Sequence, residues 1–420
     1  MQYLKEAENK FLDNYSNETE ETVKEVLNNI KTRKDLALKE YEKKFSKSDR
    51  DKLEVENDEI QKSISSLNNK EKEMIDQIVY RIKSFAEAQL ECLQPFEKDF
   101  GNGIKMGHKI IPIEKAGAYI PGGRFPLLSS GPMVVAPAKV AGVKEIIACS
   151  PANYNGGIHP AVLYGLLQSG ADRIFAVGGA QAVGAMALGT ESIPKVNVIT
   201  GPGNRFVAEA KRQVFGEVGI DLIAGPSEIM ILADEHANAE LCAADLLAQS
   251  EHDPNARAIL VSTSRELGEQ VIRKVSDLLK KFKNDSPAHE SWAKNGEVII
   301  AESIEEGIKL CNDYAIEHLH LHVKNSNQIK DELYNYGSLF IGENSSVVFS
   351  DKVSGTNHTL PTQEASKYTG GLWVGNYVKV LTHQEIHGDG VNLLAQHASE
   401  QSEMEGLEGH KLSATLRLKQ

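Results

Sequence analysis

The chain has 420 residues, more than one ordinary domain needs, so we expect at least two domains. Hydrophobic residues make up 41% of the sequence and charged residues 25%, which is typical of a globular protein with sizeable cores. The 46 Lys and Arg against 59 Asp and Glu give a net charge of -13. This acidic balance argues against a nucleic-acid partner, because phosphate binding needs a basic excess.

The N-terminal residues 1–15 carry no apolar core and no small-residue cleavage site of the kind found in signal peptides. No stretch approaches the roughly 18 apolar residues of a membrane span. The four cysteines are widely spaced and form no CxxC pair: Cys92, Cys149, Cys242 and Cys311. We therefore expect a cytoplasmic protein without a membrane partner, whose cysteines are reduced and buried.

Residues 1–100 predict amphipathic helices. Val23, Val26 and Ile30 fall on one helical face, and no glycine occurs before Gly101. A short strand at the start of 51–60 is an alternative that the pattern leaves open. Nothing in this region indicates catalysis, so we expect it to serve packing or subunit assembly.

From Lys115 onward, short apolar runs alternate with helical patterns. In the first series the predicted strands are Glu145–Cys149, Ile174–Val177, Val196–Thr200 and Glu228–Ala233. In the second they are Ala258–Ser262, Val298–Ala301, Leu319–Val323 and Ser338–Ile341. Parallel strands need crossover connections, so this alternation predicts parallel sheets. The last fifty residues return to a polar, helical pattern. The expected architecture is two α/β domains with helical extensions at both ends.

Three glycine clusters punctuate the first series: Gly122-Gly123, Gly178-Gly179 and Gly201-Pro202-Gly203-Asn204. Each lies at the end of an apolar run, where the carboxyl ends of parallel strands form a ligand crevice. The last cluster fails the dinucleotide fingerprint because Phe206 stands at the third glycine position. One cluster alone predicts a tight turn, but three in one sheet favour a bound ligand.

Two further groups contain possible metal ligands. Gln249 and His252 are three residues apart, so they share a helical face and could hold one ion, although Gln and His are an unusual pair for zinc. Downstream, Asp351 and His358 flank a loop whose Ser-Gly-Thr-Asn sequence predicts tight turns, and His410 lies near the C-terminus. On spacing alone, all of these residues are equally consistent with solvated surface groups.

The segment that begins with Glu317 and His318 continues with His320 and His322. On a strand, the three histidines point to one face and could bind zinc, which would indicate a metal-dependent hydrolase or a metal-binding protein. The simpler interpretation of His320 and His322 is the exposed polar edge of a half-buried strand. The buried face would then be supplied by the alternating residues Leu319, Leu321 and Val323.

Taken together, the motifs resemble the histidinol dehydrogenase family. Ten segments match in order: AGAYIPGG (116–123), AKVAGV (138–143), VGGAQAV (177–183), ALGTESIPKV (187–196), GPGN (201–204), AKRQVFGEVGID (210–221), AGPSEI (224–229), AADLLAQSEHD (243–253), YAIEHL (314–319) and SGTNHTLPT (354–362). The resemblance implies an α/β fold of two incomplete Rossmann-like parallel-sheet domains, with helical N- and C-terminal extensions, in a domain-swapped homodimer.

The resemblance also implies a division of the chain. Residues 1–20 would form an N-terminal helical arm. Residues 21–118 together with 235–370 would form the Rossmann-like domain that carries the metal and the catalytic residues. Residues 119–234 would form the second, NAD-binding domain, and residues 371–420 a helical dimerisation segment.

The family oxidises a primary alcohol to an acid by two hydride transfers to two NAD molecules. The resemblance implies one Zn²⁺ per subunit, held by Gln249, His252, Asp351 and, from the partner subunit, His410. His318 would take the hydroxyl proton, and Glu317 would activate water for attack on the aldehyde. The implied NAD contacts are Tyr119, Gln181 and Asn204. The implied substrate contacts are Ser227, His358 and Glu405.

Several segments depart from the usual biosynthetic enzyme. Arg124-Phe-Pro-Leu-Leu-Ser-Ser130 replaces a stretch of small residues followed by Tyr-Pro-Ser-Ser, and Tyr368–Gly375 also differs. Together with Glu408-Gly409 and the opening Gln2–Lys5, these departures resemble the branch that oxidises 2,3-dihydroxypropane-1-sulfonate to sulfolactate. We expect Arg124 to bind an anionic substrate group, since a guanidinium suits a sulfonate or carboxylate. A solvated turn residue is the alternative.

Overall fold

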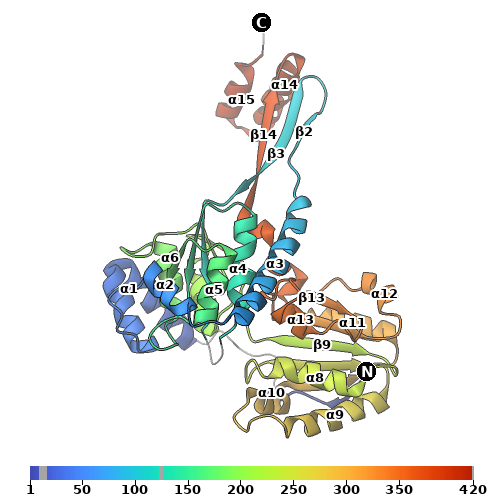
Figure 1. The fold of residues 1–420 in the computed structure, drawn as a ribbon. Coiled ribbons are helices and arrows are strands. Elements are labelled where there is room, and N and C mark those ends of the chain that lie inside the picture. Colours follow the sequence, from blue (N-terminus) through green and yellow to red (C-terminus); the bar gives the residue numbers. More distant parts are fainter. Residues whose placement is uncertain (9–16, 123–125, 419–420) are drawn as a thin grey trace.

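The computed structural model describes residues 1–8, 17–122 and 126–418. It has two α/β bodies, each built on a mainly or wholly parallel sheet, and an arm that projects from one of them (Figure 1). The expected α/β class is therefore confirmed.

The first body contains a five-stranded parallel sheet in the order β6-β5-β4-β7-β8. Its strands are β4 (Lys115–Tyr119), β5 (Glu145–Cys149), β6 (Arg173–Phe175), β7 (Val198–Thr200) and β8 (Gly219–Ile220). Helices α4 (Ser130–Val140) and α5 (Pro160–Ser169) cover one face, and α6 (Gly179–Leu188) and α7 (Arg205–Val214) cover the other. The strands are short apolar runs because both faces of the sheet are buried.

The N-terminal helices belong to this body. They are α1 (Asn17–Tyr41), a π-helix η1 (Glu42–Ser46), α2 (Asn57–Ile64) and α3 (Asn69–Glu91). Val23, Val26 and Ile30 are buried against the face formed by α6 and α7, as their spacing predicts. Region 51–60 opens with a single bridge from Glu54 to Phe175 before α2 begins. The helices thus complete the core of the first body.

The second body contains a six-stranded sheet in the order β1-β11-β10-β9-β12-β13, parallel except for β1. Its strands are β1 (Gln2–Lys5), β9 (Glu228–Ala233), β10 (Arg257–Ser262), β11 (Gly296–Ile300), β12 (His318–His322) and β13 (Ser338–Ile341). Its helices are α8 (Ala239–Ser250), α9 (Arg265–Leu279), α10 (Pro287–Asn295), α11 (Ile304–Tyr314), α12 (Ser326–Ile329) and α13 (Val347–Lys352). The core on one face contains residues of α8, α9 and α10, and the core on the other contains residues of α11 and α12. The 3-10 turns η2 (Lys330–Glu332) and η3 (Ala365–Lys367) lie in the connections that follow α12 and α13.

The arm is a three-stranded antiparallel sheet in the order β14-β3-β2. Its strands are β2 (Phe96–Asp99), β3 (Ile104–Pro112) and β14 (Val378–Ile386), and β14 follows the 3-10 turn η4 (Val374–Tyr377). The helices α14 (Asp389–Glu405) and α15 (Glu408–Thr415) lie near its outer end, beside the C-terminus (Figure 1). Large apolar side chains on the arm are exposed: Met106, Ile111, Val380, Leu381, Leu393, Leu394, Met404, Leu407, Leu412 and Leu416.

The strands differ from the expected division in three places. The expected N-terminal helical arm begins as strand β1, which pairs with β11 at the edge of the second sheet. Strand β9 belongs to the six-stranded sheet and not with 119–234, while β4 begins the five-stranded sheet before residue 119. The segment 371–420 contains strand β14 as well as helices. Each difference depends on which distant strand supplies a pairing partner, and local periodicity does not carry that information.

No helix within the described ranges combines the length and apolar character needed to cross a bilayer. Cys149, Cys242 and Cys311 are buried free thiols, as expected. Cys92 follows α3 at the surface and is exposed, so the expectation of burial is wrong for this residue.

Candidate active site

A pocket of about 760 Å³ opens between the two bodies. On one side it is lined by residues at the carboxyl ends of the five-stranded sheet, among them Tyr119 at the end of β4 and Asn204 after β7. On the other side it is lined by residues at the amino ends of the six-stranded sheet, including Ser227 before β9 and Glu317 before β12. The crevice at the first sheet was predicted from the glycine clusters. Its closure by the opposite end of the second sheet was not.

The pocket brings together most of the predicted site residues, which come from widely separated parts of the chain. Those that line it are Tyr119, Asn204, Ser227, Gln249, His252, Glu317, His318, Asp351 and His358. Gln181, Glu405 and His410 are not among the lining residues. Arg124 lies outside the described residues.

The GPGN turn shapes the wall beside α7. Gly201 has a φ of 118°, and a Cβ there would lie 2.0 Å from the carbonyl oxygen of Tyr119, so only glycine fits. The side chain of Asn204 caps α7 by accepting hydrogen bonds from the backbone N–H groups of Phe206 and Val207, at 3.1 and 3.2 Å. Arg205 and Phe206 at the start of α7 line the pocket, so the helix dipole there favours an anionic ligand such as a phosphate.

The second glycine turn, Gly178-Gly179, is held by hydrogen bonds to side chains inside the first body. The Gly179 N–H donates to the Tyr119 hydroxyl at 3.1 Å, and burial raises the pKa of Tyr119 to about 12. Glu42 accepts from Gly178 N–H at 3.1 Å and from the Gln181 side chain at 2.8 Å. Gln181 is only 2% exposed. It thus supports the turn from inside the body instead of lining the pocket.

Glu317 and His318 are fixed by backbone groups of the neighbouring strand β9. The Glu317 carboxylate accepts from the N–H of Glu228 at 2.8 Å, and Nδ1 of His318 donates to the Glu228 carbonyl at 2.8 Å. Because Nδ1 carries the hydrogen, a neutral His318 ring presents a bare Nε2. That atom is buried without a hydrogen-bond partner among the described residues, 3.9 Å from Oδ1 of Asp351. The pair is therefore oriented before any ligand arrives.

This corner of the pocket attracts positive charge. Burial raises the pKa of Glu317. For His318, burial works in the opposite direction, but the Glu317 carboxylate at 3.4 Å and Asp351 outweigh it and raise the pKa to about 9. Two carboxylates and an imidazole with an unpaired nitrogen thus favour a proton or another cation between them.

The predicted metal ligands lie beside this corner. Gln249 is in the last turn of α8 and 2% exposed, which corrects the interpretation as a surface helix end. His252 Nε2 lies 3.7 Å from Oδ2 of Asp351 in α13. That distance is too long for a hydrogen bond but close to the ~3.4 Å that separates two donors on a tetrahedral zinc ion. Burial lowers the pKa of His252, favouring the neutral ring that coordinates metals. Gln249, His252 and Asp351 all line the pocket, and their amide, imidazole and carboxylate donors suit a zinc ion.

His358 joins the two bodies. Its Nδ1 donates to the Asp351 carbonyl at 3.2 Å, and its Nε2 lies 3.4 Å from the hydroxyl of Ser130. The Ser129 hydroxyl donates to the same Asp351 carbonyl at 2.6 Å. Neither serine was predicted from the sequence to be a site residue, although both lie at the end of the segment that begins at Arg124. They hold the end of α13, which carries Asp351, against the first body.

Glu228 was also missed. Its backbone holds Glu317 and His318, while its carboxylate accepts from the N–H of Gln363 at 3.2 Å and lies 3.5 Å from the Arg257 guanidinium. Burial, with Glu317 nearby, raises the pKa of Glu228 to about 7 despite the opposing effect of Arg257. The AGPSEI motif contained this residue, but its hydrogen bonds depend on the pairing of β9 with β12.

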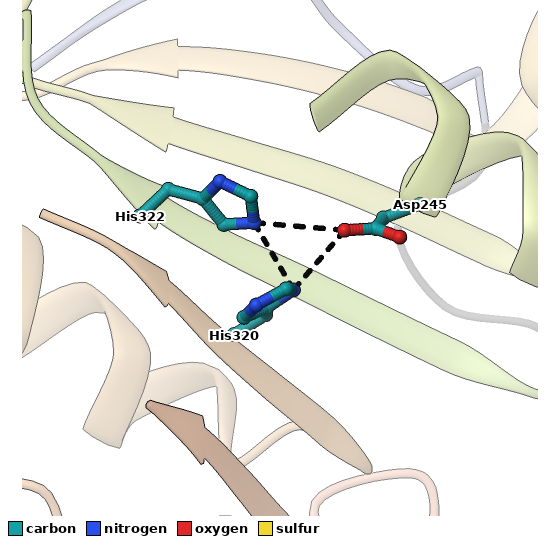
Figure 2. A group of neighbouring side chains, drawn as sticks. All are labelled: Asp245, His320 and His322. Atoms are coloured by element: carbon teal, nitrogen blue, oxygen red, sulfur yellow. Dashed lines mark hydrogen bonds and ion pairs between the residues drawn. The ribbon is translucent and has the colours of Figure 1, made fainter. Parts of the chain in front are cut away.

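The expectation of an exposed histidine edge on β12 is wrong. All five residues of the strand are buried, and His320 is 0% exposed. His318 is in the pocket, whereas His320 and His322 lie against Asp245 of α8 (Figure 2). Burial would raise the pKa of Asp245, but the two histidines and the Ser346 hydroxyl beside it hold that pKa well below its usual range. The predicted three-histidine metal site is therefore not formed by the described residues.

Comparison with known proteins agrees with these motifs. The family model described as Histidinol dehydrogenase matches residues 11–418. A "Histidinol dehydrogenase homolog" of Shouchella clausii (strain KSM-K16) is 40% identical over 420 residues, covering 100% of this chain and 99% of its own. A "Sulfopropanediol 3-dehydrogenase" of Ruegeria pomeroyi (strain ATCC 700808 / DSM 15171 / DSS-3) is 39% identical over 420 residues, covering 100% and 96%.

A solved structure, the histidinol dehydrogenase from Elizabethkingia anophelis, superposes with a TM-score of 0.91 at 35% identity and covers 96% of this chain and 93% of its own. The match extends over both bodies and the arm. The chain therefore belongs to the histidinol dehydrogenase family and is an oxidoreductase that acts on an alcohol.

Proposed function

We propose that the protein is a cytoplasmic, zinc- and NAD-dependent dehydrogenase that oxidises a small primary alcohol through its aldehyde to a carboxylate. One observation carries this proposal. A single pocket joins an oriented Glu-His pair and three zinc-type donors on one side to a glycine-rich crevice at a helix N-terminus on the other. Proton transfer, metal binding and dinucleotide binding can thus take place within one cavity.

The zinc ion would be held by Gln249, His252 and Asp351. When bound, it supplies Lewis acidity that orients the substrate hydroxyl and stabilises alkoxide character. The donor set and the His252–Asp351 spacing support this assignment.

With zinc bound nearby, Nε2 of His318 would be bare, because a neighbouring cation disfavours the proton that the raised pKa otherwise holds there. That nitrogen can then take the hydroxyl proton. Glu317 then orients and deprotonates the water that attacks the aldehyde. A second base is needed at this step because His318 has just been protonated. The resulting hydrate delivers the second hydride, so one alcohol reduces two NAD molecules.

NAD would lie along the carboxyl ends of the five-stranded sheet. Its pyrophosphate is suited to the N-terminus of α7, next to Tyr119 and Asn204. We keep Gln181 among the proposed contributors. Its amide acts through Glu42, which holds the Gly178-Gly179 turn.

The exposed arm supports a domain-swapped homodimer. Its large apolar side chains lack a core in one chain, and such patches mark protein–protein contacts. Glu405 and His410 are exposed on this arm and do not line the pocket of the same chain. We therefore assign them to the pocket of a second copy, where His410 would be the fourth zinc ligand and Glu405 a substrate contact. Ser227 and His358 complete the proposed substrate contacts.

The substrate that we favour is 2,3-dihydroxypropane-1-sulfonate. The Ruegeria pomeroyi relative and the departures at 124–130 and 368–375 support it. Leu127, Ser129 and Ser130, which follow the proposed sulfonate-binding Arg124, line the pocket. Histidinol is the second candidate, favoured by the solved Elizabethkingia anophelis relative.

The test measures kcat/KM for NAD reduction with three alcohols: the sulfonate diol, histidinol and glycerol. Glycerol keeps the carbon skeleton of the sulfonate diol but lacks its charge. A charge-assisted contact of about 1.5–3 kcal/mol predicts a preference of roughly 10- to 100-fold for the sulfonate over glycerol. Arg124→Leu should remove that preference and leave the value for glycerol unchanged. Efficient oxidation of histidinol with no oxidation of the sulfonate would overturn the substrate assignment but not the reaction.

A further inference from the structure

A second group of metal-type donors lies next to the active site, inside the second body. His320 and His322 of β12 and Asp245 of α8 point toward one another (Figure 2). We call this group the buried triad. Its atoms are closely spaced: His322 Nε2 to His320 Nδ1 is 3.1 Å, His320 Nδ1 to Asp245 Oδ2 is 3.3 Å, and His322 Nε2 to Asp245 Oδ2 is 3.5 Å. Both histidine side chains are 0% exposed, and that of Asp245 is 11% exposed.

Without an added cation, the buried triad has fewer hydrogen-bond donors than its close contacts between acceptor atoms require. Nε2 of His320 lies 3.0 Å from the Gly342 carbonyl, which can only accept, so this nitrogen carries the hydrogen. The Nδ1 of a neutral His320 is then a bare lone pair facing the Asp245 carboxylate. A neutral His322 has one N–H group, which can donate a hydrogen bond in only one of the three contacts between triad atoms. Two acceptors thus face each other at 3.3 Å in a buried site.

We propose that the buried triad binds a divalent transition-metal ion of the zinc class, separate from the ion at the catalytic pocket. Donors bound to one tetrahedral zinc through bonds of about 2.0–2.2 Å are separated by about 3.3–3.5 Å, close to the three spacings of the triad. Two imidazoles and one carboxylate form a ligand set that such ions prefer.

The surroundings of the triad resemble the outer shell of a metal site. The Ser346 hydroxyl donates to Oδ1 of Asp245 at 2.8 Å, which leaves Oδ2 directed at the histidines. The His320–Gly342 hydrogen bond fixes the tautomer and the orientation of that ring. Such contacts to ligand side chains orient metal ligands in proteins.

The ion would be structural. None of the three triad residues lines the pocket, so a substrate in the pocket does not reach them. Asp245 and Gln249 are four residues apart on one face of α8, and His318 and His320 share a face of β12. The ion would therefore fasten the helix that carries the proposed catalytic zinc ligands to the strand that carries the catalytic pair. This inference rests on the triad alone and not on the proposed function.

The test is the metal content of the full-length protein after equilibration with excess Zn²⁺ and removal of free ions, measured by mass spectrometry of the metal. We expect two zinc ions per wild-type chain, and one in Asp245→Asn and in His322→Asn. The matched control is His236→Asn. His236 is a histidine of the same body that lies beside Asp234 and Glu235 at the surface. This variant should keep both ions.

His252→Asn separates the two sites. A single wild-type ion that His252→Asn removes and Asp245→Asn retains overturns the triad site and leaves the proposed catalytic zinc intact. The reverse pattern supports the triad site and removes the proposed catalytic zinc. If the triad variants do not fold, titration of the wild-type protein with Co²⁺ decides. Absorption bands that saturate at two equivalents in the wild type, or at one equivalent in His252→Asn, support the inference. Saturation at one equivalent in the wild type with no bands in His252→Asn contradicts it.

Discussion

The ion pair between Lys211 and Asp221 offers a sharp test of how the first body holds the Gly201 turn at the proposed NAD site. The two side chains are 2% and 0% exposed. Lys211 also donates to the carbonyl of Gly201 at 3.0 Å, and Asp221 accepts from the N–H of the same glycine at 2.7 Å. The ion pair therefore fixes the position of the turn that leads into α7. Lys211→Met keeps much of the side-chain volume but leaves the Asp221 carboxylate unpaired in the interior.

Removing one partner of a buried ion pair costs about 3–5 kcal/mol, because the remaining charge stays desolvated. For a domain of this size, each kcal/mol corresponds to about 2–4 °C in melting temperature. Lys211→Met should thus lower the melting temperature by roughly 6–20 °C. The double variant Lys211→Met/Asp221→Asn should recover part of this loss, since it removes the unpaired charge. Both variants should raise the KM for NAD through the loosened Gly201 turn.

The assay is thermal unfolding followed by circular dichroism, with NAD kinetics on the same samples. Lys195→Met is the matched control, because Lys195 pairs with Glu217 in the same body and these side chains are 47% and 55% exposed. Exposed pairs contribute little, so this variant should melt close to the wild type. A Lys211→Met protein that melts like the Lys195→Met control would show that the buried ion pair does not stabilise the first body.

Four further predictions follow from the site. Gly201→Ala should raise the KM for NAD at least ~10-fold in steady-state kinetics, because its Cβ would lie 2.0 Å from the Tyr119 carbonyl oxygen; an unchanged KM would place NAD elsewhere. His318→Asn should lower kcat about 10²- to 10⁴-fold with little change in NAD binding, and near-normal turnover would remove its role as the base. Burial raises the folded-state pKa of Glu42 above its unfolded value, so the contribution of Glu42 to the unfolding free energy should slope toward higher stability as pH falls through the folded pKa toward about 4.3. In urea unfolding, Glu42→Gln should flatten that slope, and an equal slope in both proteins would contradict the assignment. Mixing inactive His410→Ala with inactive His318→Asn should restore activity if His410 acts across a dimer, and no recovery would count against the shared site.

Some features of this protein follow from local sequence. The short apolar runs predicted two parallel sheets, because strands buried on both faces need continuous hydrophobic residues. The GPGN cluster predicted a turn beside a ligand crevice, and the structure shows why: Gly201 adopts a backbone conformation that suits glycine. Gln249 and His252 both line the pocket, although α8 ends at Ser250, before His252.

Other features depend on distant partners. His320 and His322 were expected at the surface because histidine is polar, yet both are buried beside Asp245, and the Gly342 carbonyl accepts a hydrogen bond from His320. The role of Glu228 requires the parallel register between β9 and β12. Periodicity shows that a strand exists but not which sheet it joins, which is why β1 and β9 were misplaced.

The role of the arm also depends on a distant partner, which in this case would be a second chain. A single chain places His410 away from the pocket, and only the motif match connected it with the zinc ligands. Charge and spacing within one sequence do not reveal a ligand that a second copy would supply.

The central claim is a four-electron oxidation in one pocket, and its most direct test is a stoichiometric count. A limiting amount of the sulfonate diol is incubated with the zinc-loaded protein and excess NAD. NADH is measured by absorbance, and the organic product is identified by mass spectrometry. Two NADH per alcohol consumed and a carboxylate product are expected. One NADH per alcohol with the aldehyde as the final product would contradict the claim.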